Sequence, residues 1–240
     1  MINSFRSLAR FGAPLAVVLL AGSYECRAAN TDTRFFGQLA QATPAPAPAD
    51  MNSNKQLRDA AEPFEKLTEI SFSAALPKID QTIGEAETTA QGIRGLLSNE
   101  AARQLDAQMS AIKSTRQKQD RAGLALSSIE AYRVLVSAVT DKAKVPTEVS
   151  LLDYAGFRYD ADLKANPIRW DDMAQAVSFA RKNWVTLSSR VNSSTLATDF
   201  EKAINDMDKA VANKSKQIAT SSVKKELDLV DQLEKFFSAH

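Results

Sequence analysis

The segment Pro146–Trp184 is the richest part of the chain in side chains that could bind a ligand. It contains both tryptophans and two of the four tyrosines, and acidic residues are frequent in it. Aromatic faces supply contact area, and carboxylates select a cationic or hydroxyl-bearing group. We expect a ligand site formed by Tyr154, Tyr159, Asp160, Asp162 and Trp170. We expect the two aspartates of this site to be exposed in a loop.

The same aromatic residues also fit a structural interpretation. Trp170, Val177, Trp184 and Val191 are each seven residues apart, which is the spacing of the buried seam in a coiled coil. On this interpretation both tryptophans pack in a helical core and bind nothing. The sequence leaves both interpretations open.

Several common chemistries lack the residues that they need. His240 is the only histidine and the last residue, and Cys26 is the only cysteine. Serine–histidine and cysteine–histidine catalysis, zinc sites and covalent haem attachment therefore have no candidates. No glycine-rich loop precedes a helix, and the formal charge of +1 provides no basic surface for nucleic acid. We expect no enzyme activity, no cofactor, no metal and no nucleic-acid partner.

The N-terminus has the pattern of a secretory signal peptide. Arg6 and Arg10 precede an apolar run over residues 12–22, which is too short to span a bilayer. We expect residues 1–28 to be this signal peptide, removed on export to the periplasm or the medium. Ser23 stands where a lipoprotein would require cysteine, which disfavours a lipid anchor. No later segment is apolar enough to be transmembrane.

Residues 29–54 are rich in proline and alanine and predict a flexible linker, whereas residues 55–240 predict one helical domain. Apolar residues three or four apart recur along this domain, without strand-like alternation. The expected fold is all-α: an antiparallel four- to five-helix bundle. We expect a break or start at Pro63, a kink near Pro77 and a kink near Gly123. The expected helices cover residues 55–97, 98–140, 146–165, 167–191 and 196–238.

Polar residues interrupt the apolar stripe at residues 116–121 and 214–217. These stretches are either solvated where the core narrows or part of a polar layer in the middle of the bundle.

Together these patterns predict a non-catalytic binding or accessory protein of the bacterial envelope, serving as a carrier, a sensor-like module or a partner-binding module. One alternative is a binder of a cation or small ligand at the acidic and aromatic corner between the third and fourth expected helices. Another is a structural or assembly protein of the envelope. The partner is an unidentified small ligand or envelope protein, and the sequence does not determine the oligomeric state.

Overall fold

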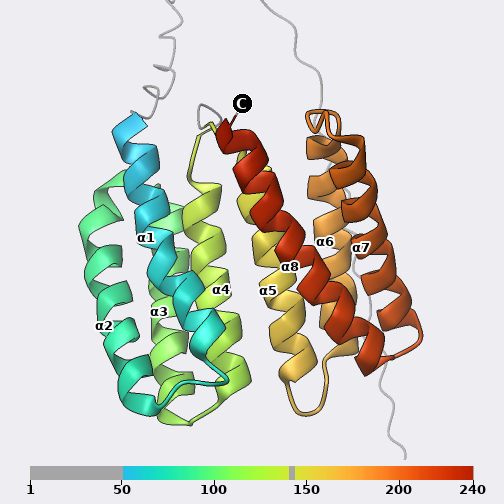
Figure 1. Ribbon diagram of the computed structural model, residues 1–240. Helices are drawn as coiled ribbons and strands as arrows, with labels where there is room; N and C mark the ends of the chain where they lie inside the picture. The colour runs from blue at the N-terminus through green and yellow to red at the C-terminus, as the bar shows by residue number, and fades with distance from the viewer. Residues whose placement is uncertain (1–50, 141–143, 240) are drawn as a thin grey trace, which may run out of the picture. The chain divides into compact units, whose positions relative to one another are not determined.

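The computed structural model describes residues 51–140 and 144–239, which fold entirely into helices and turns (Figure 1). The predicted signal peptide and most of the predicted linker lie outside these residues; the first helix begins at Met51, inside the segment predicted as linker. A short 3-10 turn, Arg94–Leu96, follows the second helix. The helices are α1 (Met51–Ile70), α2 (Leu76–Ile93), α3 (Asn99–Gln117), α4 (Arg121–Ser137), α5 (Thr147–Lys164), α6 (Trp170–Ser188), α7 (Ser194–Ala212) and α8 (Lys216–Ala239).

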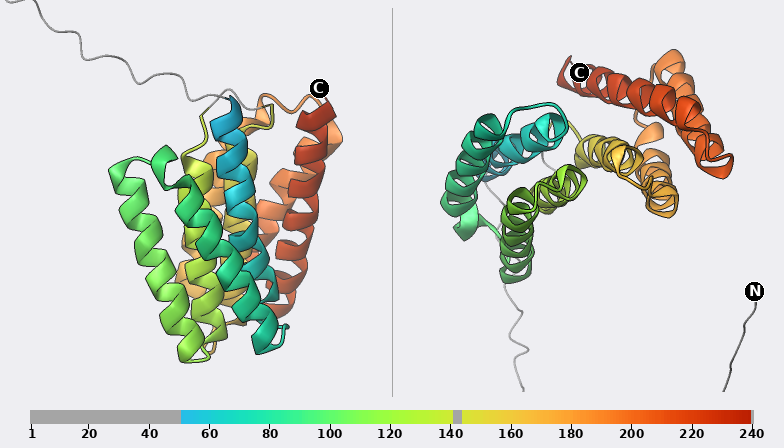
Figure 2. Two further views of the ribbon diagram at one scale, coloured as in Figure 1. Left: turned by 90° about the vertical axis from the view of Figure 1, so that its left-hand side faces the viewer. Right: turned by 90° about the horizontal axis from the view of Figure 1, so that it is seen from below.

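The helices form two halves with the same order of packing, which we call the N-terminal half (α1–α4) and the C-terminal half (α5–α8). Sequential helices are antiparallel neighbours, and the first helix of each half packs against the fourth. The halves meet mainly where α4 packs against α5, as the end-on view in Figure 2 shows. Consequently α5 is in contact with both halves of the molecule.

Each half has its own hydrophobic core. The N-terminal core contains Phe64 and Leu67 among its fully buried side chains, and the C-terminal core contains Phe200 and Trp184, whose rings stack at 4.5 Å. Tyr154 of α5 belongs to the N-terminal core, so this helix contributes side chains to both cores.

The all-α fold and the antiparallel packing are confirmed, but the expected number of helices is wrong. Three of the expected helices, over residues 55–97, 98–140 and 196–238, are each divided in two by a turn. Pro77 lies in the first turn of α2, where a backbone N–H would have no partner within the helix, so its absence in proline costs no hydrogen bond. Pro63 neither breaks nor begins a helix: α1 continues through it. Burial of Phe64 and Leu67 on the same helix offsets the lost hydrogen bond.

The two polar interruptions are exposed turns and not a polar layer. Gln119 and Lys214 have left-handed backbone conformations, with φ of 56° and 47°, at which one helix ends and the next begins. Asp120 then caps α4, because its carboxylate accepts a 2.9 Å hydrogen bond from the Gly123 backbone N–H. The helix expected to kink near Gly123 instead ends, and the chain reverses completely just before that residue.

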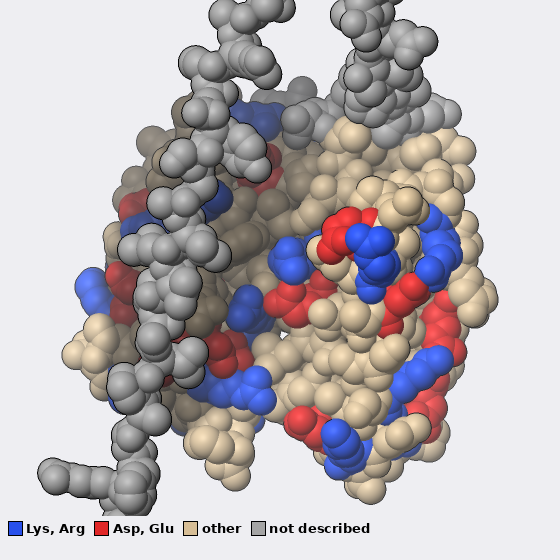
Figure 3. Space-filling model, turned by 180° about the vertical axis from the view of Figure 1, so that it is seen from behind, with Lys and Arg blue, Asp and Glu red and all other residues tan. Residues whose placement is uncertain are grey.

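No helix of the described part of the chain is long and apolar enough to cross a membrane. On the face seen in Figure 3, basic and acidic side chains alternate, so neither sign of charge dominates that face. The surface there offers no broad electrostatic attraction for a highly charged polymer.

Candidate functional site

The two tyrosines of the predicted site point to opposite sides of α5. The Tyr154 hydroxyl donates to Glu130 Oε1 at 2.6 Å and accepts from Arg158 Nη1 at 2.8 Å, on the side that faces α4. The Tyr159 hydroxyl donates to the Met207 carbonyl at 3.2 Å, inside the C-terminal half. Both hydroxyls are thus engaged within the protein, and the two rings do not share a pocket.

The other three predicted residues are also separated. Asp160 forms an ion pair with Lys164 at 2.5 Å, and Trp170 packs on the C-terminal core. Asp162 is not the exposed loop residue that we expected, because it lies in α5 and only 1% of its side chain is exposed. The five residues do not converge on one cavity, and ligand binding by them stays a prediction.

Asp162 nevertheless has unused hydrogen-bonding capacity. Neither carboxylate oxygen has a hydrogen-bond partner, and the closest cation, Arg169 Nη1, is 4.0 Å away. Burial, and then repulsion from Asp172, raises the pKa of Asp162 to about 7. This carboxyl group therefore titrates near neutral pH.

A second buried carboxyl group, which the sequence analysis missed, lies between α8 and α5. Glu226 of α8 is 0% exposed, and neither of its carboxylate oxygens has a hydrogen-bond partner. Its side chain lies on Gly156 of α5, where a Cβ would come within 2.2 Å of Glu226 Oε2. Burial raises the pKa of Glu226 well above its ordinary range. Gly156 therefore makes room for a carboxyl group that has no hydrogen-bond donor among the described residues.

Acidic side chains from three helices act on Asp153 of α5, and we call Glu65, Asp153, Glu226 and Glu234 the carboxyl cluster. They come from α1, α5 and α8. Burial raises the pKa of Asp153 well above its ordinary range, and repulsion from the other three members adds to this effect. A side-chain hydrogen bond from Tyr132 of α4 opposes the shift. Four helices from both halves thus contribute to one site.

The outer part of the cluster is also acidic. Burial raises the pKa of Glu65 to about 7, and repulsion from Glu69, Glu234, Glu62 and Asp231 contributes in that order. These neighbours lie on α1 and α8, so both helices contribute negative charge around Glu65.

Basic groups act on Glu234. Burial and then repulsion from Asp231 raise the pKa of Glu234, and Arg58 and Lys235 oppose this rise. Arg58 Nη2 also donates to the Val145 carbonyl at 2.7 Å. Neither base is a hydrogen-bond partner of Glu226. The deep carboxyl groups therefore remain without a cation in contact.

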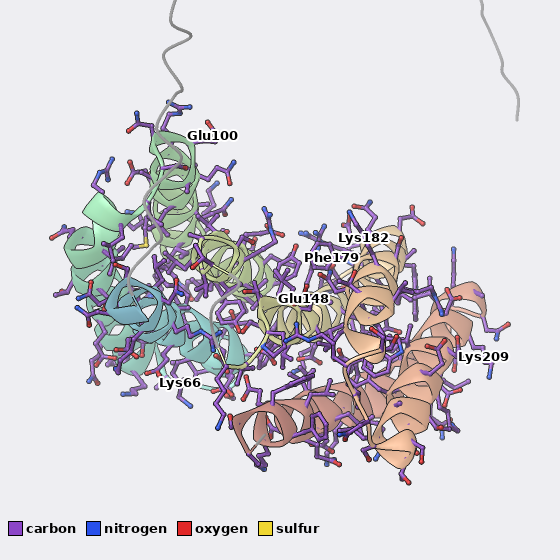
Figure 4. All side chains as sticks on the ribbon, turned by 90° about the horizontal axis from the view of Figure 1, so that it is seen from above. Lys66, Glu100, Glu148, Phe179, Lys182 and Lys209 are labelled. Atoms are coloured by element: carbon purple, nitrogen blue, oxygen red, sulfur yellow. The ribbon has the colours of Figure 1, made fainter. Side chains whose placement is uncertain are left out.

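The cluster and the Tyr154 network lie on different faces of α5. In Figure 1, α1 and α8 both lie in front of α4 and α5. Figure 4 shows that Phe179, which packs edge-on against Tyr154 at 5.2 Å, lies on the other side of α5 from α8. The carboxyl cluster is therefore the site at which α1 and α8 converge on α5.

Among the described residues, no group of three histidine, cysteine, aspartate or glutamate side chains is arranged to hold a metal ion. Comparisons with protein-family models, with curated proteins and with solved structures found no match to this chain.

Proposed function

We propose that the chain is an exported, non-catalytic binding protein of the bacterial envelope, and that the carboxyl cluster binds an organic cation. The observation that carries this proposal is Glu226, a fully buried carboxyl group without a hydrogen-bond donor. A buried polar group without a partner costs free energy, and a cationic donor would remove that cost.

The arrangement of the cluster favours an extended cation. Glu226 and Glu234 are eight residues apart on α8, which corresponds to about 12 Å along a helix. A linear diamine could place one ammonium group beside Asp153 and Glu226 and the other near the exposed Glu234. Buried ammonium–carboxylate hydrogen bonds are charge-assisted and stronger than neutral ones.

Export is supported by the sequence of the N-terminal segment alone. Arg6, Arg10 and the apolar residues 12–22 have the order of a signal peptide. A periplasmic or secreted protein would meet small cations supplied from outside the cell, which fits a carrier or sensor-like role.

Calorimetric titration of the full chain with cadaverine (1,5-diaminopentane) tests the binding site. We expect wild-type protein to bind this diamine, and Asp153→Asn and Glu226→Gln each to weaken binding by about tenfold or more, because each removes a charge-assisted hydrogen bond.

Two controls match this experiment. The uncharged isostere 1,5-pentanediol should bind at least about tenfold more weakly, since it lacks the ammonium groups. Asp228→Asn, an exposed acid on α8, should leave the affinity unchanged. Equal affinities in wild type, Asp153→Asn and Glu226→Gln would refute the proposed site, as would a wild-type protein that binds no cadaverine.

The corner between α5 and α6 is a second candidate for cation or small-ligand binding, because both oxygens of Asp162 lack partners. In the same titration, a loss of binding in Asp162→Asn but not in Glu226→Gln would favour this corner.

A further inference from the structure

The carboxyl cluster contains more acid than its surroundings neutralise. Asp153 and Glu226 lie on facing sides of α5 and α8, and repulsion acts between them. A negative charge on Glu226, which is fully buried and has no hydrogen-bond donor among the described residues, is strongly unfavourable without a cation. The unliganded cluster is therefore stable only when some of its carboxyl groups hold protons.

The ionisable side chains on the helices around the cluster do not supply a cation to its buried carboxyl groups. On α4, the Tyr132 hydroxyl hydrogen-bonds to Asp153, and its own pKa is raised, first by burial and then by Asp153. The bases, Arg58 and Lys235, act on Glu234 at the rim. The charged groups that face the cluster are Arg58, Glu62 and Glu69 on α1 and Asp231 and Lys235 on α8.

Building on the proposed function, we propose that a cation enters the carboxyl cluster in exchange for protons, so that the site binds as the pH rises and releases as it falls. Each carboxyl group that binds an ammonium group must first lose its proton to the solvent. The total charge of the site then changes little, because an ammonium charge replaces each proton.

The pKa values set the direction and the range of this dependence. Glu65, with a pKa of about 7, loses its proton near neutral pH, and burial raises the pKa values of Asp153 and Glu226 well above their ordinary range. A cation that favours the ionised groups lowers these pKa values, and by linkage its affinity increases with pH. The affinity increases about tenfold per pH unit for each proton released.

Cadaverine is a suitable probe because both of its amines stay charged over this range, as lysine-type amines do. Titration calorimetry of the full chain at about pH 6 and about pH 8, in two buffers of different ionisation enthalpy, counts the protons released. We expect release of at least one proton and an affinity at least about tenfold higher at the higher pH.

A failure of the proton exchange can be distinguished from a failure of the proposed function. Binding without proton release, and with the same affinity at both pH values, overturns the exchange and leaves the proposed function standing. No binding of cadaverine by wild-type protein at either pH overturns both.

A second measurement tests whether carboxyl groups of the cluster are protonated when no ligand is bound. Infrared spectra of the unliganded protein at neutral pH should contain the carbonyl band of a protonated carboxyl group, and Glu226→Gln should lose part of it. Asp228→Asn, on the exposed side of α8, should keep the full band. Identical spectra of wild type and Glu226→Gln would overturn the exchange even if cadaverine binds.

Discussion

The two halves of the molecule have similar helices but differ in whether their buried polar side chains are hydrogen-bonded. In the described part of the N-terminal half, each buried polar side chain is hydrogen-bonded, mostly to a carbonyl four residues earlier on its own helix; these residues are Asn54, Thr68, Ser71, Thr82 and Ser128. The C-terminal half instead buries Asp162 and Glu226, whose carboxylate oxygens have no partners.

This difference has a chemical cause. A hydroxyl group can donate to a carbonyl of its own helix, so its burial needs nothing from elsewhere. An ionised carboxylate only accepts, and inside a helix the backbone N–H groups are already used. A buried acid must therefore hold a proton or receive a donor from outside. The described part of the N-terminal half therefore satisfies its buried polar side chains locally, whereas the C-terminal half contains two buried acids that it does not satisfy.

The largest expected effect tests whether the halves unfold as one unit. Phe64→Ala in the N-terminal core and Phe200→Ala in the C-terminal core each remove a fully buried ring and should lower the unfolding free energy by about 3–5 kcal/mol. Trp170 and Trp184 both lie in α6, so tryptophan fluorescence reports on the C-terminal half, whereas circular dichroism reports on all helices.

Packing of α4 on α5 should make the two signals coincide in both variants. If Phe64→Ala shifts the circular dichroism transition but leaves the fluorescence transition in place, the halves are independent domains.

The second prediction replaces the buried acid by an apolar side chain of similar length. Glu226→Met should stabilise the protein by about 1–4 kcal/mol near pH 8, because it removes an unpaired buried carboxyl group. The gain should be smaller near pH 5, where Glu226 is protonated because burial raises its pKa. Denaturant unfolding measures both values, with Asp228→Asn as the exposed control. A loss of stability at pH 8 would show that Glu226 has a stabilising partner.

The third prediction tests the close contact between α5 and α8. Gly156→Ala places a methyl group against Glu226 Oε2 and against Leu227 Cδ2, at 2.2 and 2.6 Å, and should destabilise the protein by about 1–3 kcal/mol. In a Glu226→Ala background the same change should cost less, because the truncated side chain leaves space. Additive effects in the double-mutant cycle would contradict this contact.

The smallest expected effect concerns the pH dependence of Asp162. Its pKa of about 7 in the folded protein is higher than that of an unfolded aspartate, so the folded state holds the proton more tightly. Stability from this group is complete at low pH and is lost as the pH rises through about 7. Asp162→Asn should therefore flatten the fall in thermal midpoint with pH and be about 2–4 °C more stable than wild type near pH 8.

Asp160→Asn is the matched control, since Asp160 is partly exposed and paired with Lys164. It should change the midpoint less than Asp162→Asn does. An unchanged pH profile in Asp162→Asn would mean that Asp162 is ionised in the folded protein at all pH values measured.

Local signals in the sequence were sufficient for much of the fold. Ser98 caps α3, since its hydroxyl accepts from the Ala101 N–H, and Asn166-Pro167 separates α5 from α6. The seven-residue spacing favoured burial of both tryptophans; Trp184 is buried, and Trp170 is partly buried against the C-terminal core. Each of these features depends on residues a few positions apart, so the sequence alone determines it.

One part of the site also had a local signal that we did not use. The buried residues Ala219, Val223, Val230, Leu233 and Phe237 of α8 follow steps of three and four only if Glu226 belongs to the same stripe. An acid in a core position of an amphipathic helix predicts a buried carboxyl group.

The rest depended on tertiary structure. Gln119 and Lys214 adopt left-handed conformations that their residue types do not demand, so the number of helices was not readable from the sequence. The carboxyl cluster joins Glu65, Asp153 and Glu226 from helices far apart in the chain. Which faces of α1, α5 and α8 meet is decided by the packing of both cores, and the raised pKa values follow from that packing.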